Sequence, residues 1–353
     1  MLSSKKPNTT VGLDIETGSI AATEVRTNGS AGVSRTAMAP LPPGVVAEGE
    51  VQDAKALSEA LKELFSKNKL GKAVRLGIAN QSVVVRTMRM PLIEDPKELD
   101  TAIRFQAQEQ IPMPLDQAVL DHQVIARENG PEGERQMDVV AVAARRDMVS
   151  SLLASLRAAG LRPTGIDLSA FGMIRALGFG DADPEEGAVQ TTTLCCHLGD
   201  ITNLAVARGS QCLFTRVAPF GLENIAAAVA ERNDMDLDEA REWMVEVGLD
   251  EPIEEFGEDR EEAIAARGKL AEGASTLADE LRVSLDFYGA QEGMPPIERV
   301  VLCGPGSTIG GLPERIQSGL GLGIEVMSPQ ALEHLDREDA ARLTVSYGLA
   351  LDA

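Results

Sequence analysis

The feature of this sequence that most constrains its fold is a β-hairpin pattern that occurs twice, about half a chain apart. The first copy covers residues 11–25, where two apolar runs flank the turn 16–19 (Glu-Thr-Gly-Ser). The second covers 193–207, with the turn 199–202 (Gly-Asp-Ile-Thr). Extended runs around a short turn of small polar residues are typical of a hairpin. No short-period repeat accompanies the pair, so solenoids and propellers are excluded. The second half of the chain instead repeats the hairpin of the first half once.

These turns have the chemistry of a phosphate-binding site. Small residues let backbone N–H groups approach an anion, the hydroxyls of Thr17 and Ser19 can donate, and Asp14 can hold a hydrated cation. A third glycine-rich turn, 304–307, lies between a strand pattern and a helix pattern. A glycine-rich turn that leads into a helix N-terminus is a ready anion or nucleotide site. One such turn alone favours a plain hairpin turn, whereas three in this order indicate a nucleotide site much more specifically.

Between the two hairpins, residues 75–160 have the pattern of a compact mixed α+β unit. Strand patterns lie at 75–79, 83–90, 119–126 and 137–144, and helix patterns at 96–110 and 147–159. Before this unit, apolar residues at helical spacing predict a helix with Asp53 as its N-cap and Gly71 as its stop. After the second hairpin, helices are expected over 223–247 and 261–289.

The charge of the chain excludes several classes of partner. With 55 acidic and 33 basic side chains the net charge is −22, which opposes nonspecific binding to nucleic acid or anionic lipid. More than half of the excess lies in 231–262, which holds 15 acidic and three basic side chains. The four cysteines lack CxxC spacing, so no zinc knuckle is expected. No apolar run reaches the ~20 residues that span a bilayer, so membrane association is expected only through a partner.

The chain resembles the actin-like ATPase fold and, within it, the PilM family of cytoplasmic type IV pilus assembly proteins more than the FtsA cell-division proteins. The order of hairpin, inserted unit, second hairpin, acidic helical region and late glycine-rich turn carries this resemblance. It spans residues 10–352 and is specific at family level. The matching segments are 11–15, 41–46, 48–51, 90–91, 102–105, 109–112, 143–146, 160–163, 166–167, 281–288 and 347–350.

The resemblance implies an α/β protein with the two-lobed actin-like, ribonuclease-H-like fold and an α+β subdomain inserted into the first lobe. The expected units are the first-lobe core at 10–74, the inserted subdomain at 75–165, the second-lobe core at 166–218, a small acidic helical subdomain at 219–295, and a return at 296–353 that carries the adenosine turn and leads back to the first lobe.

The resemblance also implies a nucleotide, ATP or ADP with Mg²⁺, in the cleft between the lobes, and no catalytic residue is assigned. The phosphate-binding residues would be Asp14, Thr17, Gly18, Ser19, Gly199, Asp200 and Thr202. The ribose and adenosine contacts would be Gly221, Glu223, Asn224, Gly304, Gly306 and Ser307. Asp14 and Asp200 would hold Mg²⁺ through water.

Four residues depart from the family pattern. Glu16 stands where glycine is usual, Ala21 where a lysine commonly contacts phosphate, and His197 where the second turn normally opens with aspartate. Pro305 replaces another glycine and removes a backbone donor. A lost cation and an added carboxylate each change the interaction with phosphate by several kcal/mol in a partly buried site (about one unit charge each). We therefore expect weak nucleotide binding with weak or no ATPase activity. His197 is expected to be a strand-end histidine with a hydrogen-bonded partner, the alternative being a pH-sensitive replacement for the acid.

The resemblance implies that the partner is the N-terminal cytoplasmic segment of a PilN-like inner-membrane protein, bound in a groove formed with the inserted unit. The chain would then be cytoplasmic and peripheral to the inner membrane, linked indirectly to PilO and the pilus motor complex, with a homo-oligomer ring as an option. The alternatives are an FtsA-like filament former, an active ATPase or sugar kinase, and the cytoplasmic domain of the secretion protein GspL. The absence of a basic amphipathic tail, of an intact phosphate site and of a membrane helix respectively disfavours them.

Overall fold

Two five-stranded sheets form the frame of the computed structural model, which describes residues 9–27, 31–129, 134–178, 190–291 and 293–351. The first sheet has the order β10-β6-β1-β2-β3 and the second β13-β12-β11-β14-β15. The strands of the first are β1 (Thr9–Ile15), β2 (Ser19–Thr27), β3 (Ala31–Pro40), β6 (Ala73–Ile78) and β10 (Arg162–Leu168). Those of the second are β11 (Thr192–Leu198), β12 (Thr202–Arg208), β13 (Gln211–Ala218), β14 (Arg299–Cys303) and β15 (Ile324–Val326).

The strands of the two sheets run in matching directions. In each sheet three consecutive strands pair antiparallel, β1-β2-β3 in one and β11-β12-β13 in the other. Each sheet then continues from its first strand through two parallel neighbours, β6 and β10 or β14 and β15. Both expected hairpins are therefore present, and they occupy equivalent places in two similarly built lobes.

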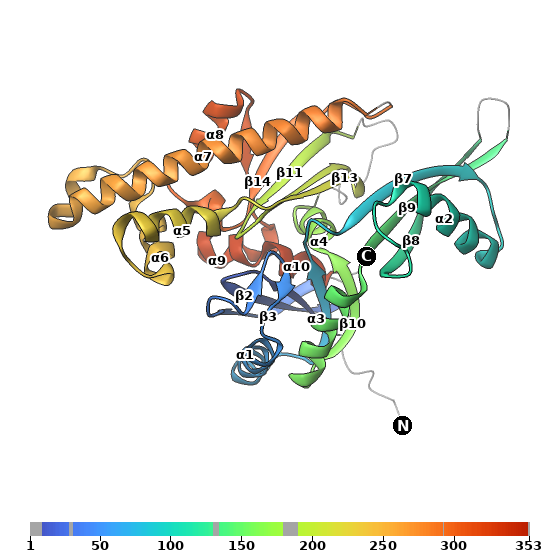
Figure 1. Ribbon diagram of the computed structural model, residues 1–353, viewed down its shortest axis with the longest axis horizontal. Helices are drawn as coiled ribbons and strands as arrows, with labels where there is room; N and C mark the ends of the chain where they lie inside the picture. The colour runs from blue at the N-terminus through green and yellow to red at the C-terminus, as the bar shows by residue number, and fades with distance from the viewer. Residues whose placement is uncertain (1–8, 28–30, 130–133, 179–189, 292, 352–353) are drawn as a thin grey trace.

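Helices lie on both faces of each sheet (Figure 1). Two short helices, α4 (Ser169–Ala176) and α10 (Thr344–Ala350), pack on each other between the sheets, α10 against β1 and α4 against β12. Helices α1 (Ala54–Lys67) and α3 (Arg146–Ala158) cover the outer face of the first sheet, and α5 (Leu222–Asn233), α7 (Arg260–Gly289) and α8 (Leu312–Leu320) cover that of the second.

Glycine allows the close approach of α10 to its neighbours. A Cβ on Gly12 of β1 would lie 1.9 Å from the carbonyl oxygen of Ser346, and one on Gly348 would lie 1.7 Å from that of Gly172 in α4. Both obstacles are backbone atoms, which cannot move aside as a flexible side chain could. Through these contacts α10, the last helix of the chain, packs directly against β1 and α4.

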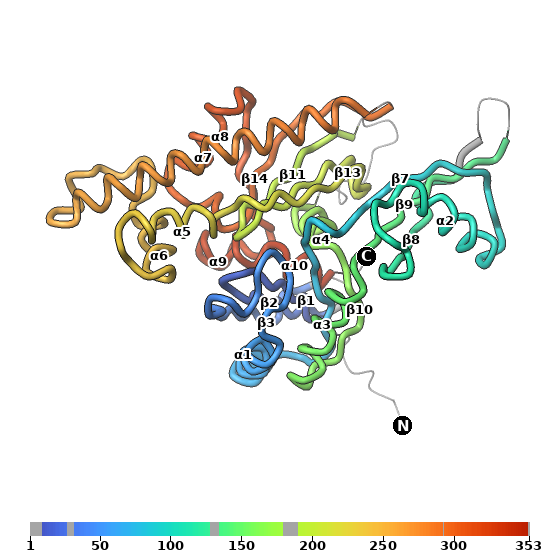
Figure 2. Tube along the Cα trace, viewed as in Figure 1, coloured from blue at the N-terminus to red at the C-terminus, as the bar shows by residue number. Residues whose placement is uncertain are grey.

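A separate three-stranded sheet, β7-β9-β8, forms the centre of the inserted unit. Its strands are β7 (Val84–Pro91), β8 (Ala118–Asn129) and β9 (Arg135–Arg145), and α2 (Pro96–Gln110) packs on it. Figure 2 shows the chain leaving the first lobe along β7 and returning along β9. The sequence assigned 75–165 to this unit, but β6 and β10 pair within the first sheet and α3 packs against α1. We call residues 84–145 the inserted module, and the division of the chain into units stays a prediction.

The acidic region differs in detail from the sequence prediction. The helix expected over 223–247 is two helices, because Asp234 takes a left-handed φ of 53° and Asp236 caps α6 (Leu237–Val247). The second expected stretch, 261–289, is the single helix α7, preceded by the 3₁₀ segment η1 (Ile253–Asp259). The remaining elements are β4 (Val46–Ala47), β5 (Glu50–Val51), η2 (Pro305–Thr308), η3 (Gln330–Leu332) and α9 (Arg337–Arg342). Within the described residues, no helix is long and apolar enough to span a membrane.

Candidate functional site

The two hairpin turns meet in the cleft between the lobes. The first turn is closed by the Glu16 N–H, which donates to the carbonyl oxygen of Ser19 at 2.9 Å. Across the cleft, the Gly18 N–H donates to Oδ2 of Asp200 at 2.7 Å, although 182 residues separate the two in sequence. The lobes are thus joined directly at the two turns that the sequence assigned to phosphate binding.

Little space remains between the turns. A cavity of about 20 Å³ lies there, and Asp14, Thr17 and Asp200 line it together with Glu16 and His197. A second cavity of about 10 Å³ is lined by Asp14, Glu16, Ser19, Ala21, Pro305 and Arg342. Each is close to the volume that one water molecule needs, ~10–15 Å³ on the same measure. The cleft is therefore closed in this conformation.

Three carboxyl groups share this closed cleft, and burial raises the pKa of each. The pKa of Asp14 rises to about 7, because burial outweighs a hydrogen bond from Ser169 and the Asp200 charge adds to the shift. Burial, followed by the charges of Asp200 and Asp14, raises the pKa of Glu16 well above its ordinary value. Burial raises the pKa of Asp200 too, against the lowering effect of its hydrogen bond from Gly18. The cleft therefore disfavours additional negative charge.

Glu16, the first departure from the family pattern, faces the second turn. A Cβ on Gly199 would lie 2.1 Å from Oε1 of Glu16, so the carboxylate takes the space that a side chain at 199 would fill. Glu16 does not turn away from the proposed phosphate position, because it lies against the backbone of the turn that a phosphate would approach.

His197 lacks the hydrogen-bonded partner that the sequence predicted. Its Nδ1 lies 3.8 Å from Oε1 of Glu16, longer than a hydrogen bond, and its Nε2 is buried without a partner among the described residues. The prediction was wrong because the ring packs against the bare Cα of Gly304, where a Cβ would lie 2.8 Å from Nε2. Burial lowers the pKa of His197 to about 4, which keeps the ring neutral at pH 7.

The residues expected near the ribose are engaged by the protein itself. Arg241 of α6 holds Glu223 through two hydrogen bonds, 2.6 Å from Nη2 and 3.0 Å from Nε. Asn224 accepts the backbone N–H of Gly221 at 2.9 Å and so caps α5. A Cβ on Gly221 would lie 2.4 Å from the carbonyl oxygen of Asp200, which places this glycine directly behind the second turn.

The remaining expected contacts are also satisfied internally. The Ser307 hydroxyl donates to the carbonyl oxygen of Gly304 at 2.7 Å, and the Thr202 hydroxyl donates to that of Phe220 at 2.7 Å. Gly304 has a φ of +82°, a conformation that favours glycine. Gly306 packs on Leu198, where a Cβ would lie 2.7 Å from that residue's own Cβ. This turn is therefore buried and packs tightly against the end of β11.

In this conformation the cleft does not fit a nucleoside triphosphate or its metal ion. The Gly18 N–H is occupied by the Asp200 carboxylate, the Glu16 carboxylate lies against Gly199 of the second turn, and the cavities hold about one water each. Among the residues that the structure describes, no group of three or more His, Cys, Asp or Glu has the arrangement of a metal site. A nucleotide would have to displace Glu16 and part the lobes.

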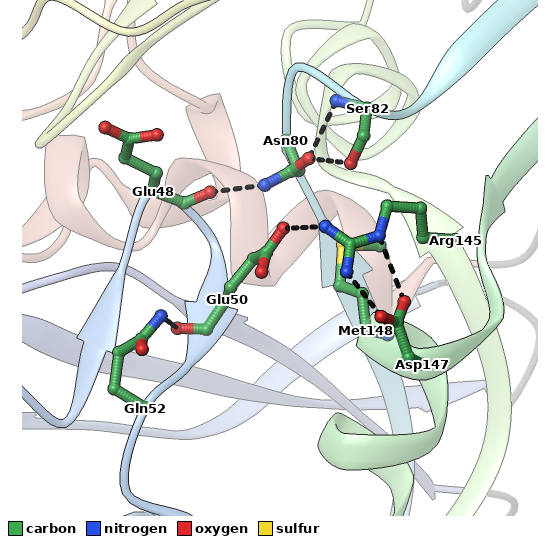
Figure 3. Close-up of polar contacts among 8 residues, drawn as sticks. All are labelled: Glu48, Glu50, Gln52, Asn80, Ser82, Arg145, Asp147 and Met148. Atoms are coloured by element: carbon green, nitrogen blue, oxygen red, sulfur yellow. Dashed lines mark hydrogen bonds and ion pairs between the residues drawn. The ribbon is translucent and has the colours of Figure 1, made fainter. Parts of the chain in front are cut away.

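A second polar cluster joins the inserted module to the first lobe (Figure 3). The Asn80 amide donates to the carbonyl oxygen of Glu48 at 2.5 Å, and Arg145 donates to Glu50 at 3.0 Å while also pairing with Asp147. Glu48 itself has a positive φ of 50°. Arg145, the last residue of the module, is thereby tied to the first lobe.

The comparisons with known proteins agree with this geometry. The sequence model for the type IV pilus assembly protein PilM matches residues 12–353. The chain belongs to the PilM family. A structure described as the PilM–PilN type IV pilus biogenesis complex is 27% identical, with a TM-score of 0.79 over 97% of each chain.

Two more distant structures share the fold of this PilM-family chain. The ethanolamine utilization protein EutJ from Carboxydothermus hydrogenoformans is 15% identical, with a TM-score of 0.55 over 99% of this chain and 92% of that one. MreB5 of Spiroplasma citri bound to ADP is 13% identical, with a TM-score of 0.52 over 97% and 94%. The chain has the mixed α/β, actin-like fold that the sequence predicted.

Two cleft residues of this PilM-family chain escaped the sequence reasoning. Arg342 of α9 lines the cavity beside Ala21, and its charge lowers the pKa of both Glu16 and Asp200. Arg241 lies over the first turn, where a Cβ on Gly18 would be 2.8 Å from its Cζ. Neither has a local signal, because one ends a short helix and the other lies among acidic residues. Only the closure of the two lobes brings these cations to the turns.

Proposed function

We propose that this chain is the cytoplasmic adaptor of a type IV pilus assembly machine and binds the N-terminal cytoplasmic segment of a PilN-like inner-membrane protein. The observation that supports this most is the likeness to the PilM–PilN complex, which covers 97% of both chains. The partner holds the chain at the inner membrane, next to a PilO-like protein and the motor complex.

The inserted module has a surface suited to an apolar segment of such a peptide. An open groove of about 580 Å³ lies between β7 and α2, and the Phe105 side chain at its edge is 67% exposed. Exposed apolar surface of this kind is typical of protein-binding sites. The groove is lined by Met90, Pro91, Ile93, Lys97, Glu98, Thr101, Ala102, Phe105 and Gln106.

A binding titration tests the adaptor role. The purified chain is titrated with the first dozen or so residues of the neighbouring PilN-like protein, with and without Mg-ATP. Saturable binding is expected, weakened about tenfold or more in Phe105→Ser, as for loss of a buried aromatic anchor. Lys55→Gln on α1 is the control, since Lys55 is exposed and does not line the groove. Absence of binding under both conditions would refute the adaptor role.

Within this role we propose that the cleft binds nucleotide weakly. Glu16 of the first turn lies against the second turn, and Ala21 supplies no positive charge for a phosphate. The buried carboxyl groups disfavour the added negative charge of a polyphosphate. Calorimetry on the purified chain is expected to show weak or no Mg-ATP binding, and the double variant Glu16→Gly, Ala21→Lys should bind more tightly. Tight binding by the unaltered chain would contradict the proposal. An unchanged affinity in the variant would show that these positions do not face phosphate.

A further inference from the structure

Each turn of the cleft places one carboxylate against the other. The Gly18 N–H of the first turn donates to the Asp200 carboxylate of the second at 2.7 Å. In return, the Glu16 carboxylate of the first turn lies against Gly199 of the second. The contact is reciprocal, and it involves both of the turns assigned to phosphate binding.

The shape of the turns is fitted to this exchange. A Cβ at 199 would lie 2.1 Å from Oε1 of Glu16, and a Cβ at 18 would lie 2.8 Å from Cζ of Arg241, so each charged group would have to shift if its glycine gained a side chain. The two glycines leave space for charged groups of the chain itself.

The charges around the exchange are also balanced from within the chain. The positive charge of Arg342 lowers the pKa of both Glu16 and Asp200, and that of Arg241 lowers the pKa of Asp200. Arg241 is itself paired with Glu223, the residue expected at the ribose. Backbone N–H groups beside cations are what an anion-binding turn offers to a ligand. Here carboxyl groups of the chain itself occupy that place.

We infer that the Glu16 and Asp200 side chains take the place of a phosphate and hold the two lobes closed without nucleotide. The cleft then works as a fixed joint, and the first lobe with its module keeps one orientation relative to the second. The consequence for the partner rests on the proposed adaptor function: the chain binds the PilN-like segment equally well with and without Mg-ATP.

Hydrogen exchange of the two amides tests the joint directly. The full chain, purified without nucleotide, is analysed by mass spectrometry with fragmentation to single residues. Both the Gly18 and Asp200 amides are expected to be protected. Asp200→Ala should speed exchange at Gly18 by about tenfold or more, as for loss of a hydrogen bond to a carboxylate. Glu16→Ala removes the side chain that covers the second turn, so it should speed exchange at Asp200.

Two further variants separate this joint from a general loss of structure. Glu16→Gln keeps a side chain of the same size, so it should restore most of the protection of the Asp200 amide that Glu16→Ala loses. Glu59→Ala removes an exposed carboxylate of α1 and should leave both amides unchanged. Unprotected amides in the unaltered chain, or protection that survives both Glu16→Ala and Asp200→Ala, would overturn the inference.

The peptide titration distinguishes the joint from the adaptor role. Peptide binding that is equal with and without Mg-ATP, together with protected amides, supports the inference. Protected amides without any peptide binding would remove the adaptor role and leave the joint standing. Binding that requires Mg-ATP would overturn the joint and keep the adaptor.

Discussion

The two sheets of this PilM-family chain have the same strand order and directions, yet equivalent positions carry different chemistry. Gly12 and Cys195 are each the fourth residue of a seven-residue strand, and each lies in the strand that starts its lobe. Two positions later stand Asp14 and His197. The strand pairing is the same in both sheets because it depends on backbone hydrogen bonds. The side chain that fits at each position depends instead on the residues that pack against it. The predictions below exchange or remove these differences.

The largest expected effect comes from giving the first lobe the residue of the second. In Gly12→Cys the new Cβ would lie 1.9 Å from the Ser346 carbonyl oxygen, so α10 must shift, and unfolding free energy should fall by about 3 kcal/mol or more. Cys195→Ala leaves only a small cavity and should cost about 1 kcal/mol. Chemical denaturation measures both. If Gly12→Cys does not fold, Gly12→Ala provides the comparison, and equal costs in the two lobes would contradict the prediction.

The next effect concerns a buried carboxylate that the second lobe lacks. Glu24 of β2 accepts hydrogen bonds from the Gly71 N–H at 2.7 Å, Ser34 at 2.7 Å and Arg35 at 2.9 Å. Glu24 pairs with Val11 of β1, and the equivalent residue of β12 is Val206, which pairs with Leu194 of β11. Glu24→Ala removes the acceptor of these three part-buried hydrogen bonds and should lower the unfolding free energy by about 2–3 kcal/mol at pH 7. Denaturation in urea measures it.

The same variant makes a prediction about pH. These donors lower the pKa of Glu24 despite its burial. Its stabilising contribution is therefore present above the unfolded-state pKa and is lost as pH falls through the lower pKa of the folded state. The stability difference between the wild type and Glu24→Ala should shrink below about pH 4. A difference that stays constant down to pH 3 would show that the carboxylate charge is not what stabilises this site.

Asp14 and His197 should give opposite pH dependences. The pKa of Asp14 is raised to about 7, so its contribution to stability is present at low pH and is lost as pH rises from about 4 to 7. The pKa of His197 is lowered to about 4, so protonation of the unfolded chain removes stability as pH falls below about 6.5. For one proton the slope is at most about 1.4 kcal/mol per pH unit.

Two variants test this opposition between the turns. Relative to wild type, Asp14→Asn should gain stability as pH rises from 5 to 7, whereas His197→Gln should lose relative stability over the same range. Unfolding free energy is measured at several pH values, with Glu59→Gln as a surface control. If the difference in unfolding free energy from the wild type changes with pH in the same direction for both variants, the prediction that burial affects Asp14 and His197 in opposite ways is contradicted.

The smallest effect concerns helix caps on the outer layers. Asp53 accepts the N–H groups of Lys55 and Ala56 at 2.9 Å each and so caps α1, whereas α8 of the second lobe begins after Gly311. Asp53→Ala should cost about 1 kcal/mol, and Asp53→Ser should recover most of it. Thermal or urea unfolding detects the loss. A null result would show that α1 is held by packing alone.

Local pattern was enough to predict most of the elements. The expected helix at 96–110 is α2 with the same bounds, and Asp53 caps α1 as its position in the sequence indicated. One error came from a feature without a local signal, since the left-handed Asp234 divides one expected helix into two. The places of β6 and β10 in the first sheet also have no local signal, because they depend on pairing with distant strands.

The sequence by itself determined the two hairpins and most of the helices, because these depend on spacing and on residue types within short segments. The resemblance to the PilM family was confirmed by the family model that matches residues 12–353. It also marked Glu16, Ala21 and His197 as departures. Only the tertiary structure decided what the departures do, since it brings Gly18 to a carboxylate 182 residues away and adds Arg342 from the last helices. Those contacts depend on closure of the lobes, and a hydrogen bond between distant segments leaves no periodic trace in the chain.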